Sequence, residues 1–120
     1  MRVPNDQHYP VMWHLDSIGA EAAWDISTGD ASQRVGIVDT GILRNHEDLI
    51  NKDAFGYDFV TCNNTFNNCG NTNDGDGRDA NYNDPGDACD NGDSDSFHGT
   101  HVSGTMVAST NNSVGMAGTN

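Results

Sequence analysis

The chain has 120 residues, about one small domain, and its apolar fraction of 34% with 14 glycines allows only a modest hydrophobic core. Its 18 aspartates and glutamates face 5 lysines and arginines, which gives a net charge of -13. Nucleic acids and anionic membranes are therefore not expected as partners, because both bind clustered positive charge.

The first part of the chain predicts an extended arm, a short helix and a strand. Residues 3–16 have no periodicity. Ser17 is a suitable N-cap for a helix that ends near Thr28. Residues 35–38 form a continuous apolar run with β-branched side chains, which is typical of a buried strand in a parallel sheet.

The second part of the chain alternates short elements with one long polar insertion. Residues 46–49 fit one helical turn, and residues 57–60 fit a second short strand. Residues 61–97 contain almost no aliphatic side chains, and a loop of this length inside a domain is usually functional or disordered. From His98 onward, residues recur at helical spacing, which predicts a helix that begins there.

The polar insertion is strongly acidic, and only Arg78 opposes its run of aspartates. So many carboxylates repel one another unless cations neutralise them, and hard oxygen ligands favour calcium. The aspartates of this run are Asp74, Asp76, Asp79, Asp84, Asp87, Asp90, Asp93 and Asp95.

Three cysteines, Cys62, Cys69 and Cys89, lie in or beside the insertion. Their polar, Asn-rich surroundings suit disulfide bonds in an oxidising compartment, outside the cell. Cys62 and Cys69 are close enough in sequence to bridge, which would leave Cys89 to pair outside this chain, but Cys62–Cys89 and Cys69–Cys89 stay open. A zinc site is disfavoured because the spacing fits no common pattern and no histidine lies beside the cysteines.

Two local motifs carry chemistry. Residues 35–42 place Asp39 at the C-terminal end of a hydrophobic strand, where open α/β sheets have their sites, and Gly41 permits a sharp turn. Residues 98–105 place His98 at the start of a helix. The positive end of the helix dipole disfavours the imidazolium there, so the ring stays able to accept a proton.

Together, Val-Asp-Thr-Gly followed by His-Gly-Thr-His-Val-Ser-Gly-Thr resembles the signature pair of the subtilase family, in that family's order. The resemblance covers most of the chain and points to the thermitase-like, bacterial extracellular branch. It implies a secreted serine endopeptidase with an Asp-His-Ser triad, in which Asp39 is the aspartate, His98 the general base and His101 structural. It also implies an α/β fold of three layers, a parallel sheet between helices.

The nucleophile of that triad has no counterpart in this sequence. The family's Gly-Thr-Ser-Met-Ala motif and its oxyanion-hole asparagine are absent, and neither Ser103 nor Ser109 sits in a turn that would expose its hydroxyl. We therefore expect residues 1–120 to be the N-terminal portion of the catalytic domain, with the acidic insertion at about 61–97. The serine would come from a C-terminal remainder of the same enzyme, and the substrates would be proteins or peptides.

The same resemblance implies calcium at two sites. In the first, Asp6 and Asp48 would supply carboxylates and Asn112 a side-chain oxygen, with backbone carbonyls from Ser109, Val114 and Met116. The second would lie in the acidic insertion, because subtilases with a similar Gly-Arg-Asp and Asp-Pro-Gly-Asp loop are known. Its candidate residues are Asp74, Asp76, Arg78 and Asp79, completed by Asp84 or Asp87.

Two other interpretations are open. Asp39-Thr40-Gly41 after an apolar strand is also the aspartic protease motif, but no second carboxylate from a symmetry-related lobe is evident, and residues 98–105 would stay unexplained. The run from Asp74 to Asp95 resembles a thrombospondin-type acidic repeat and would suit a non-enzymatic calcium-binding adhesion module. Such arrays need several repeats, and this chain has one.

Overall fold

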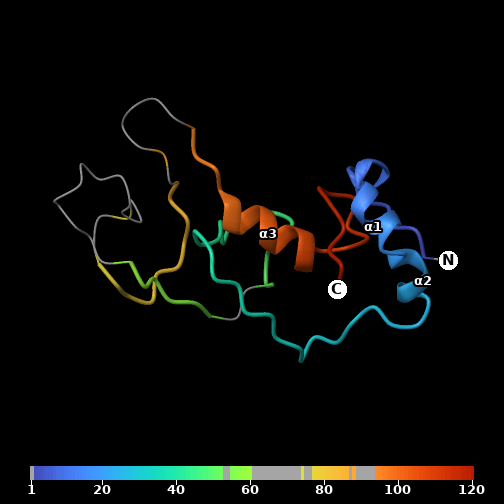
Figure 1. Cartoon of the computed structure of the whole chain (residues 1–120), viewed down its shortest axis with the longest axis horizontal. Coiled ribbons are helices and arrows are strands. Elements are labelled where there is room, and N and C mark those ends of the chain that lie inside the picture. Colours follow the sequence, from blue (N-terminus) through green and yellow to red (C-terminus); the bar gives the residue numbers. More distant parts are fainter. Residues whose placement is uncertain (1, 53–54, 61–73, 75–76, 87, 89–93) are drawn as a thin grey trace. The chain divides into compact units, whose positions relative to one another are not determined.

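The computed structural model describes residues 2–52, 55–60, 74, 77–86, 88 and 94–120 (Figure 1). In these residues the regular elements are one 3₁₀ helix and three α-helices. They are η1 (Tyr9–Val11), α1 (Trp13–Ser17), α2 (Ala20–Trp24) and α3 (His98–Val107). None of the described helices is long and apolar enough to cross a membrane.

The chain divides into two compact units that alternate along the sequence. The first unit consists of Met1–Gly36, Asn45–Lys52 and Ser103–Asn120, and the second of Ile37–Arg44 and Asp53–Val102. Helix α3 therefore begins in the second unit and ends in the first.

The first unit has a small hydrophobic core around helices α1 and α2. Tyr9 packs against the core with its ring centroid 6.4 Å from that of Trp24. Trp24 Nε1 donates a hydrogen bond to the carbonyl oxygen of Thr119 at 3.0 Å, which ties α2 to the last residues of the chain. The buried members of the core are Met12, Leu15, Ala20, Trp24 and Ala117.

The single helix predicted from Ser17 to about Thr28 is wrong. Ser17 is the last residue of α1, and its hydroxyl donates to the carbonyl oxygen of Trp13 at 3.0 Å. Gly19 has a φ of +68°, a left-handed conformation that glycine adopts without steric cost, and α2 begins at the next residue. The region is therefore two helices of 5 residues each, separated at a glycine.

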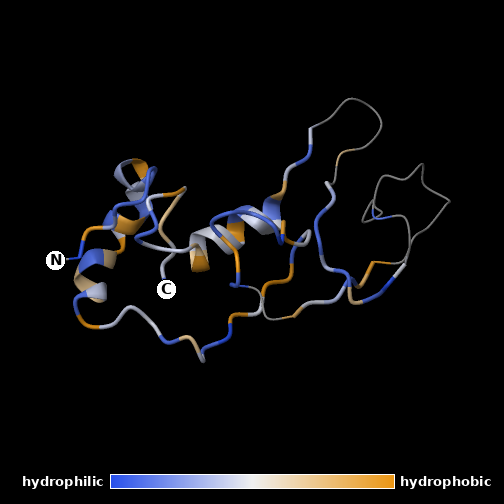
Figure 2. Cartoon of the chain, turned by 180° about the vertical axis from the view of Figure 1, so that it is seen from behind, coloured by the Kyte–Doolittle hydropathy of each residue, from blue (hydrophilic) through white to orange (hydrophobic). Residues whose placement is uncertain are grey.

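The two predicted strands, residues 35–38 and 57–60, are not paired strands in the part of the chain that the structure describes. Val35 and Val38 are exposed, with 52% and 103% relative accessibility. Figure 2 shows hydrophobic residues along the extended segments as well as on the helices. A buried strand forms only where neighbouring strands and helices pack against it. Among the described residues no such neighbours pack against these apolar segments, so the three-layer sheet stays a prediction.

Short backbone pairings hold the second unit instead. Ile42 forms an isolated parallel bridge with Asn83. The Ile42 N–H donates to the carbonyl oxygen of Tyr82 at 3.2 Å, and the Asp84 N–H donates to that of Ile42 at 3.1 Å. This bridge fixes the segment that follows Asp39 against residues 82–84 of the acidic insertion.

The backbone confirms the start of one predicted helix, because α3 begins at His98. Residues 46–49, predicted as one helical turn, form a turn outside the assigned helices, in which the Leu49 N–H donates to the carbonyl oxygen of His46 at 2.9 Å. The predictions for the three cysteines and for part of the acidic run lie outside the described residues, namely Cys62, Cys69, Cys89, Asp76, Asp87, Asp90 and Asp93.

Candidate active site

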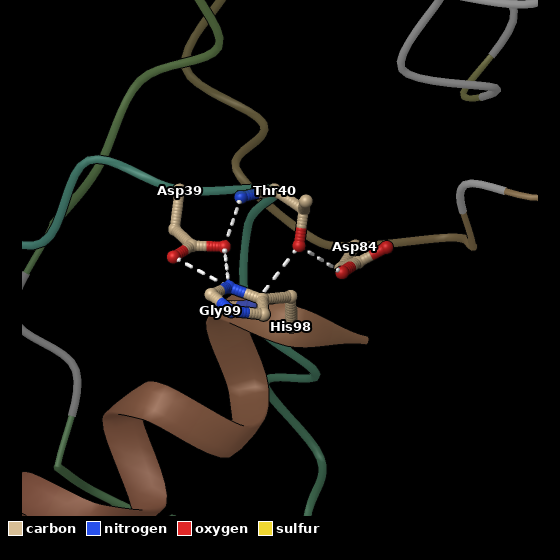
Figure 3. A network of polar contacts seen from close by, with 5 residues as sticks. All are labelled: Asp39, Thr40, Asp84, His98 and Gly99. Carbon is tan, nitrogen blue, oxygen red and sulfur yellow. Dashed lines mark hydrogen bonds and ion pairs between the residues drawn. The ribbon is translucent and has the colours of Figure 1, made fainter. Parts of the chain in front are cut away.

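The structure brings Asp39 and His98 together, although they are 59 residues apart in the sequence. His98 Nδ1 lies 2.9 Å from each carboxylate oxygen of Asp39 (Figure 3). A carboxylate can only accept, so the Nδ1–H donates to Asp39. In the neutral ring Nε2 is then unprotonated and can accept a proton, and the His98 side chain is 62% exposed.

The backbone holds the Asp39 carboxylate in its ionised form. The Thr40 N–H donates to Oδ1 of Asp39 at 2.8 Å. This amide, and after it the hydrogen bond from His98, lowers the pKa of Asp39 below its ordinary value. The carboxylate is therefore charged at neutral pH, as it must be to stabilise an imidazolium at His98.

Two glycines let the segment of Asp39 meet the first turn of α3. A Cβ on Gly99 would collide with the carbonyl oxygen of Gly41 and would lie 3.2 Å from the Asp39 Cβ. Gly41 itself has a φ of +110°, which favours glycine. The two motifs found in the sequence therefore require glycine at these positions so that the backbones can approach closely.

A buried carboxylate completes this part of the second unit, and the sequence did not predict its contacts. The Thr40 hydroxyl donates to Oδ2 of Asp84 at 2.8 Å and accepts from the Gly99 N–H at 3.0 Å (Figure 3). The other Asp84 oxygen, Oδ1, accepts from the Gly86 N–H at 2.9 Å. Asp84 was expected as a calcium ligand. It is 1% exposed, and each of its two carboxylate oxygens accepts a hydrogen bond from the protein.

The first candidate calcium site gathers two buried carboxylates on one loop of the first unit. Oδ2 and Oδ1 of Asp6 accept from the N–H groups of Asn111 and Asn112, at 2.9 and 3.2 Å. Oδ1 of Asp48 accepts from the Asn112 side-chain amide, and Oδ2 accepts from the Met116 N–H, both at 2.9 Å. The structure thus brings Asp6, Asp48 and Asn112 together. Asn112 turns its amide nitrogen to Asp48, and its Oδ1, the predicted ligand atom, accepts from the Val114 N–H at 2.9 Å.

The chemistry of this loop fits a hard cation. Asp6 and Asp48 are 3% and 1% exposed, and within the described residues neither forms an ion pair with a lysine, arginine or histidine. Two buried carboxylates that contact the same loop favour a cation that would neutralise them. Gly115 permits the approach, since a Cβ there would collide with the Asp48 carboxylate.

The three residues that the sequence predicts to supply carbonyl ligands lie in this loop. The Ser109 N–H donates to the backbone carbonyl oxygen of Asp48 at 2.9 Å, and Val114 and Met116 follow in the loop. Across the described ranges, no group of three or more His, Cys, Asp or Glu side chains is placed to hold a metal. Amide and carbonyl oxygens would therefore have to complete a calcium shell.

A residue just before the acidic insertion, Asp58, was missed as a candidate ligand in the sequence analysis. Asp58 is 7% exposed, and its Oδ1 accepts from the Val60 N–H at 2.6 Å. Its Oδ2 is buried and has no hydrogen-bond partner among the described atoms. The Asp58 N–H donates to the carbonyl oxygen of Asp79 at 2.8 Å. Asp58 Oδ2 is thus a buried oxygen without a partner beside this insertion, and it could bind a calcium ion as a ligand.

The other candidates in the insertion are placed as follows. Oδ1 of Asp79 accepts from the Asn81 N–H at 2.6 Å. The Arg78 guanidinium lies over the Phe59 ring, 5.6 Å from its centroid. Because a guanidinium is cationic and has no acceptor, only the backbone carbonyl of Arg78 could serve as a ligand. Asp74 is partly buried, and Asp76 lies outside the described residues.

Residues 30–120 match the subtilase family, so the match includes both Asp39 and His98. The chain belongs to this family. A subtilase assignment is at odds with the aspartic protease interpretation of Asp39-Thr40-Gly41.

This subtilase chain has relatives that include an extracellular protease and thermitase. It is 40% identical to the extracellular protease of Xanthomonas campestris pv. campestris, over 97% of this chain and 21% of that protein. It is 36% identical to thermitase of Thermoactinomyces vulgaris, over 97% of this chain and 32% of that protein. The chain thus spans a third or less of the length of these two relatives.

A solved structure gives the subtilase chain a subtilisin-like fold. The match is to a protease from Pseudoalteromonas arctica PAMC 21717, with a TM-score of 0.78 and 38% identity. It covers 98% of this chain and 35% of that one. The residues described here therefore correspond to about a third of that protease chain.

Proposed function

We propose that this subtilase chain supplies the aspartate and the histidine of an Asp-His-Ser triad in a secreted endopeptidase. The observation that carries the proposal is the contact of His98 Nδ1 with both Asp39 oxygens at 2.9 Å. The serine would lie in a part of the protein outside residues 1–120. Relatives named as extracellular proteases support secretion and protein substrates.

In the proposed mechanism, the serine hydroxyl attacks the carbonyl carbon of the scissile peptide. His98 takes the hydroxyl proton at Nε2 and then gives it to the leaving amine. Asp39 accepts the Nδ1–H throughout, which fixes the tautomer and stabilises the imidazolium. The lowered pKa of Asp39 supports this role, because the carboxylate stays charged during the reaction.

The exposed apolar run at residues 35–38 supports the finer part of the fold prediction. Val38 is fully exposed in the described residues. We propose that the remainder of the catalytic domain pairs with this run and completes a parallel sheet between two helical layers. The same remainder would carry the serine and most of the specificity pocket.

Calcium is proposed as the cofactor at both candidate sites. The first would use Asp6, Asp48 and Asn112 side chains with carbonyls of Ser109, Val114 and Met116. The second would use Asp58 with Asp74, Asp76 and Asp79 and the carbonyl of Arg78, and Asp58 takes the place of Asp84 because its Oδ2 has no hydrogen-bond partner among the described atoms. Bound calcium would supply positive charge that stabilises these loops, and it takes no part in the proposed proton transfers.

A serine-directed fluorophosphonate tests the proposed function in the complete secreted protein. It should abolish peptide hydrolysis and label a serine outside residues 1–120, while a pepsin-type inhibitor has no effect. His98→Ala should reduce kcat/KM on the order of 10⁴-fold and prevent labelling, because the base is gone. His8→Ala, an exposed histidine of the arm, is the matched control. Undiminished hydrolysis by His98→Ala, or labelling of Ser103 or Ser109, would refute the proposal.

A further inference from the structure

The Thr40 hydroxyl links two groups that fix its direction. The Asp84 carboxylate can only accept, so the Thr40 hydroxyl hydrogen points to Oδ2 of Asp84. The oxygen lone pairs of Thr40 are then left for the Gly99 N–H, which donates to them at 3.0 Å. One directional chain of hydrogen bonds thus runs from the first turn of α3 to a buried carboxylate (Figure 3).

Burial and two further hydrogen bonds hold Asp84 in place. Its side chain is almost fully buried, and its Oδ1 accepts from the Gly86 N–H. Its own N–H donates to the carbonyl oxygen of Ile42. Asp84 therefore contacts the residues on both sides of Gly41, through the Thr40 hydroxyl and through the Ile42 carbonyl.

The residues that Asp84 restrains are the neighbours of the two groups that exchange the proton. Thr40 follows Asp39 directly and also binds its carboxylate through the backbone N–H. Gly99 follows His98 directly. Because glycine has no side chain, its backbone N–H is the group that binds the Thr40 hydroxyl. The orientation of the Thr40 hydroxyl therefore links the backbone at Asp39 to the backbone at His98.

We propose that Asp84 is a positioning residue of the active site, acting through the Thr40 hydroxyl to hold His98 against Asp39. The inference rests on the proposed function, and it gives Asp84 a role other than calcium binding. It also explains why a carboxylate is needed. Asp84 accepts one hydrogen bond on each oxygen. The amide of asparagine offers one acceptor, so its NH₂ group would face either the Gly86 N–H or the Thr40 oxygen.

The test compares kcat per active site in the complete protease, with sites counted by fluorophosphonate titration. Asp84→Asn should lower kcat roughly 10- to 100-fold with KM nearly unchanged, because misplacement of a catalytic group by about 1 Å has effects of this size. Thr40→Val should lower kcat similarly, and the double variant should lose little more than either single variant. Thr40→Ser, which keeps the hydroxyl, should retain most activity. Asp16→Asn, at an exposed position of α1, should behave as wild type.

The outcomes separate this inference from the proposed function. If the wild type is insensitive to the fluorophosphonate, the proposed function fails. If the wild type is sensitive and Asp84→Asn keeps kcat per site within twofold, or changes only KM, the positioning role is overturned. If Asp84→Asn does not fold, Thr40→Val decides by the same criterion. A kcat loss that chelation reproduces fully in the wild type would assign Asp84 to a cation and also overturn the inference.

Discussion

Asp39 in the second unit and Asp48 in the first show two different uses of a carboxylate. Asp39 has a side chain 15% exposed and faces an imidazole that is 62% exposed and can change its charge. Asp48 is 1% exposed and faces two amide donors whose charge is fixed. A group that assists proton transfer needs a titratable partner that substrate can reach, whereas a group that holds a loop needs permanent donors.

Both regions nevertheless depend on a glycine at the point of closest approach. Gly99 lets the first turn of α3 contact the backbone of Gly41, and Gly115 lets the loop close over the Asp48 carboxylate. A side chain on Gly99 would collide with the Gly41 backbone, and a side chain on Gly115 would collide with the Asp48 carboxylate. The difference between the regions therefore lies in the charge of the partner and in exposure, and less in how closely the backbones pack.

The largest effect on this comparison is expected from Gly99→Ala. The added Cβ would collide with the Gly41 carbonyl oxygen, so α3 must move away from Asp39. We expect kcat per active site to fall on the order of 100-fold and the free energy of unfolding to fall by about 1–3 kcal/mol. Steady-state kinetics and thermal unfolding of the complete protease measure both.

The same helix provides a matched control for that substitution. A Cβ on Gly104 would meet Met116 Sδ at 3.6 Å, an ordinary contact. Gly104→Ala should keep activity and leave stability unchanged or raised by up to about 1 kcal/mol, since alanine favours the helix. Equal effects of Gly99→Ala and Gly104→Ala would contradict the role assigned to the contact between Gly99 and Gly41.

Local sequence predicted that Asp39 and His98, the proposed catalytic pair, act together, because each lies in a short motif with its own signal. Asp39 follows an apolar run, and His98 begins a helix whose start the structure confirms. The helix predicted from Ser17 was wrong because a polar residue before an apolar pattern looks like a cap, while the left-handed turn at Gly19 has no periodic signature.

Contacts between distant segments could not be predicted in this way. Thr40 and Asp84 are 44 residues apart, and nothing in the acidic run distinguishes a buried aspartate from a solvated one. Asp58 was missed because a single aspartate in a short apolar segment suggests the edge of a strand. The sheet depends on which strands pair. An apolar run such as residues 35–38 predicts that the strand is buried, but it does not predict which strand lies beside it.

Calcium removal should lower the thermal stability by an amount that depends on Asp48 and does not depend on Asp39. A chelator should lower the Tm of the fluorophosphonate-inhibited protease by roughly 5–10 °C, as expected for calcium at about 100 times its Kd. Asp48→Asn should reduce this shift while keeping kcat per active site in calcium. Asp39→Asn should keep the shift and lose activity. Differential scanning calorimetry with and without calcium measures the shift.

Two further variants sharpen the calcium experiment. Asp58→Asn should remove the part of the shift that comes from the acidic insertion, and the double variant with Asp48→Asn should remove nearly all of it. Asp16→Asn, exposed on α1, should respond as the wild type does. A shift of equal size in the wild type and in the double variant would place the calcium elsewhere.

The smallest expected effect is the pH dependence of stability, which has opposite directions in the two regions. In the second unit the pKa of Asp39 is lowered, so its stabilising contribution is lost as the pH falls below about 3.8 through the folded-state pKa. In the first unit, burial and then the hydrogen bond to Glu21 Oε1 at 2.7 Å raise the pKa of Tyr9 to about 12. A raised pKa stabilises the fold below pH 10, and this contribution is lost as the pH rises from 10 to about 12.

Tyr9→Phe isolates the alkaline part of this difference. The ring keeps its contact with Trp24, and the hydroxyl that donates to Glu21 is removed. Below pH 10 the wild type should be more stable by about 1 kcal/mol, the usual net value of one hydrogen bond. The advantage should disappear by about pH 12, because the folded protein then also loses the proton. Thermal unfolding of both inhibited proteins from pH 8 to 12 measures it, and a constant difference over that range would show that Tyr9 titrates alike in the folded and unfolded chains.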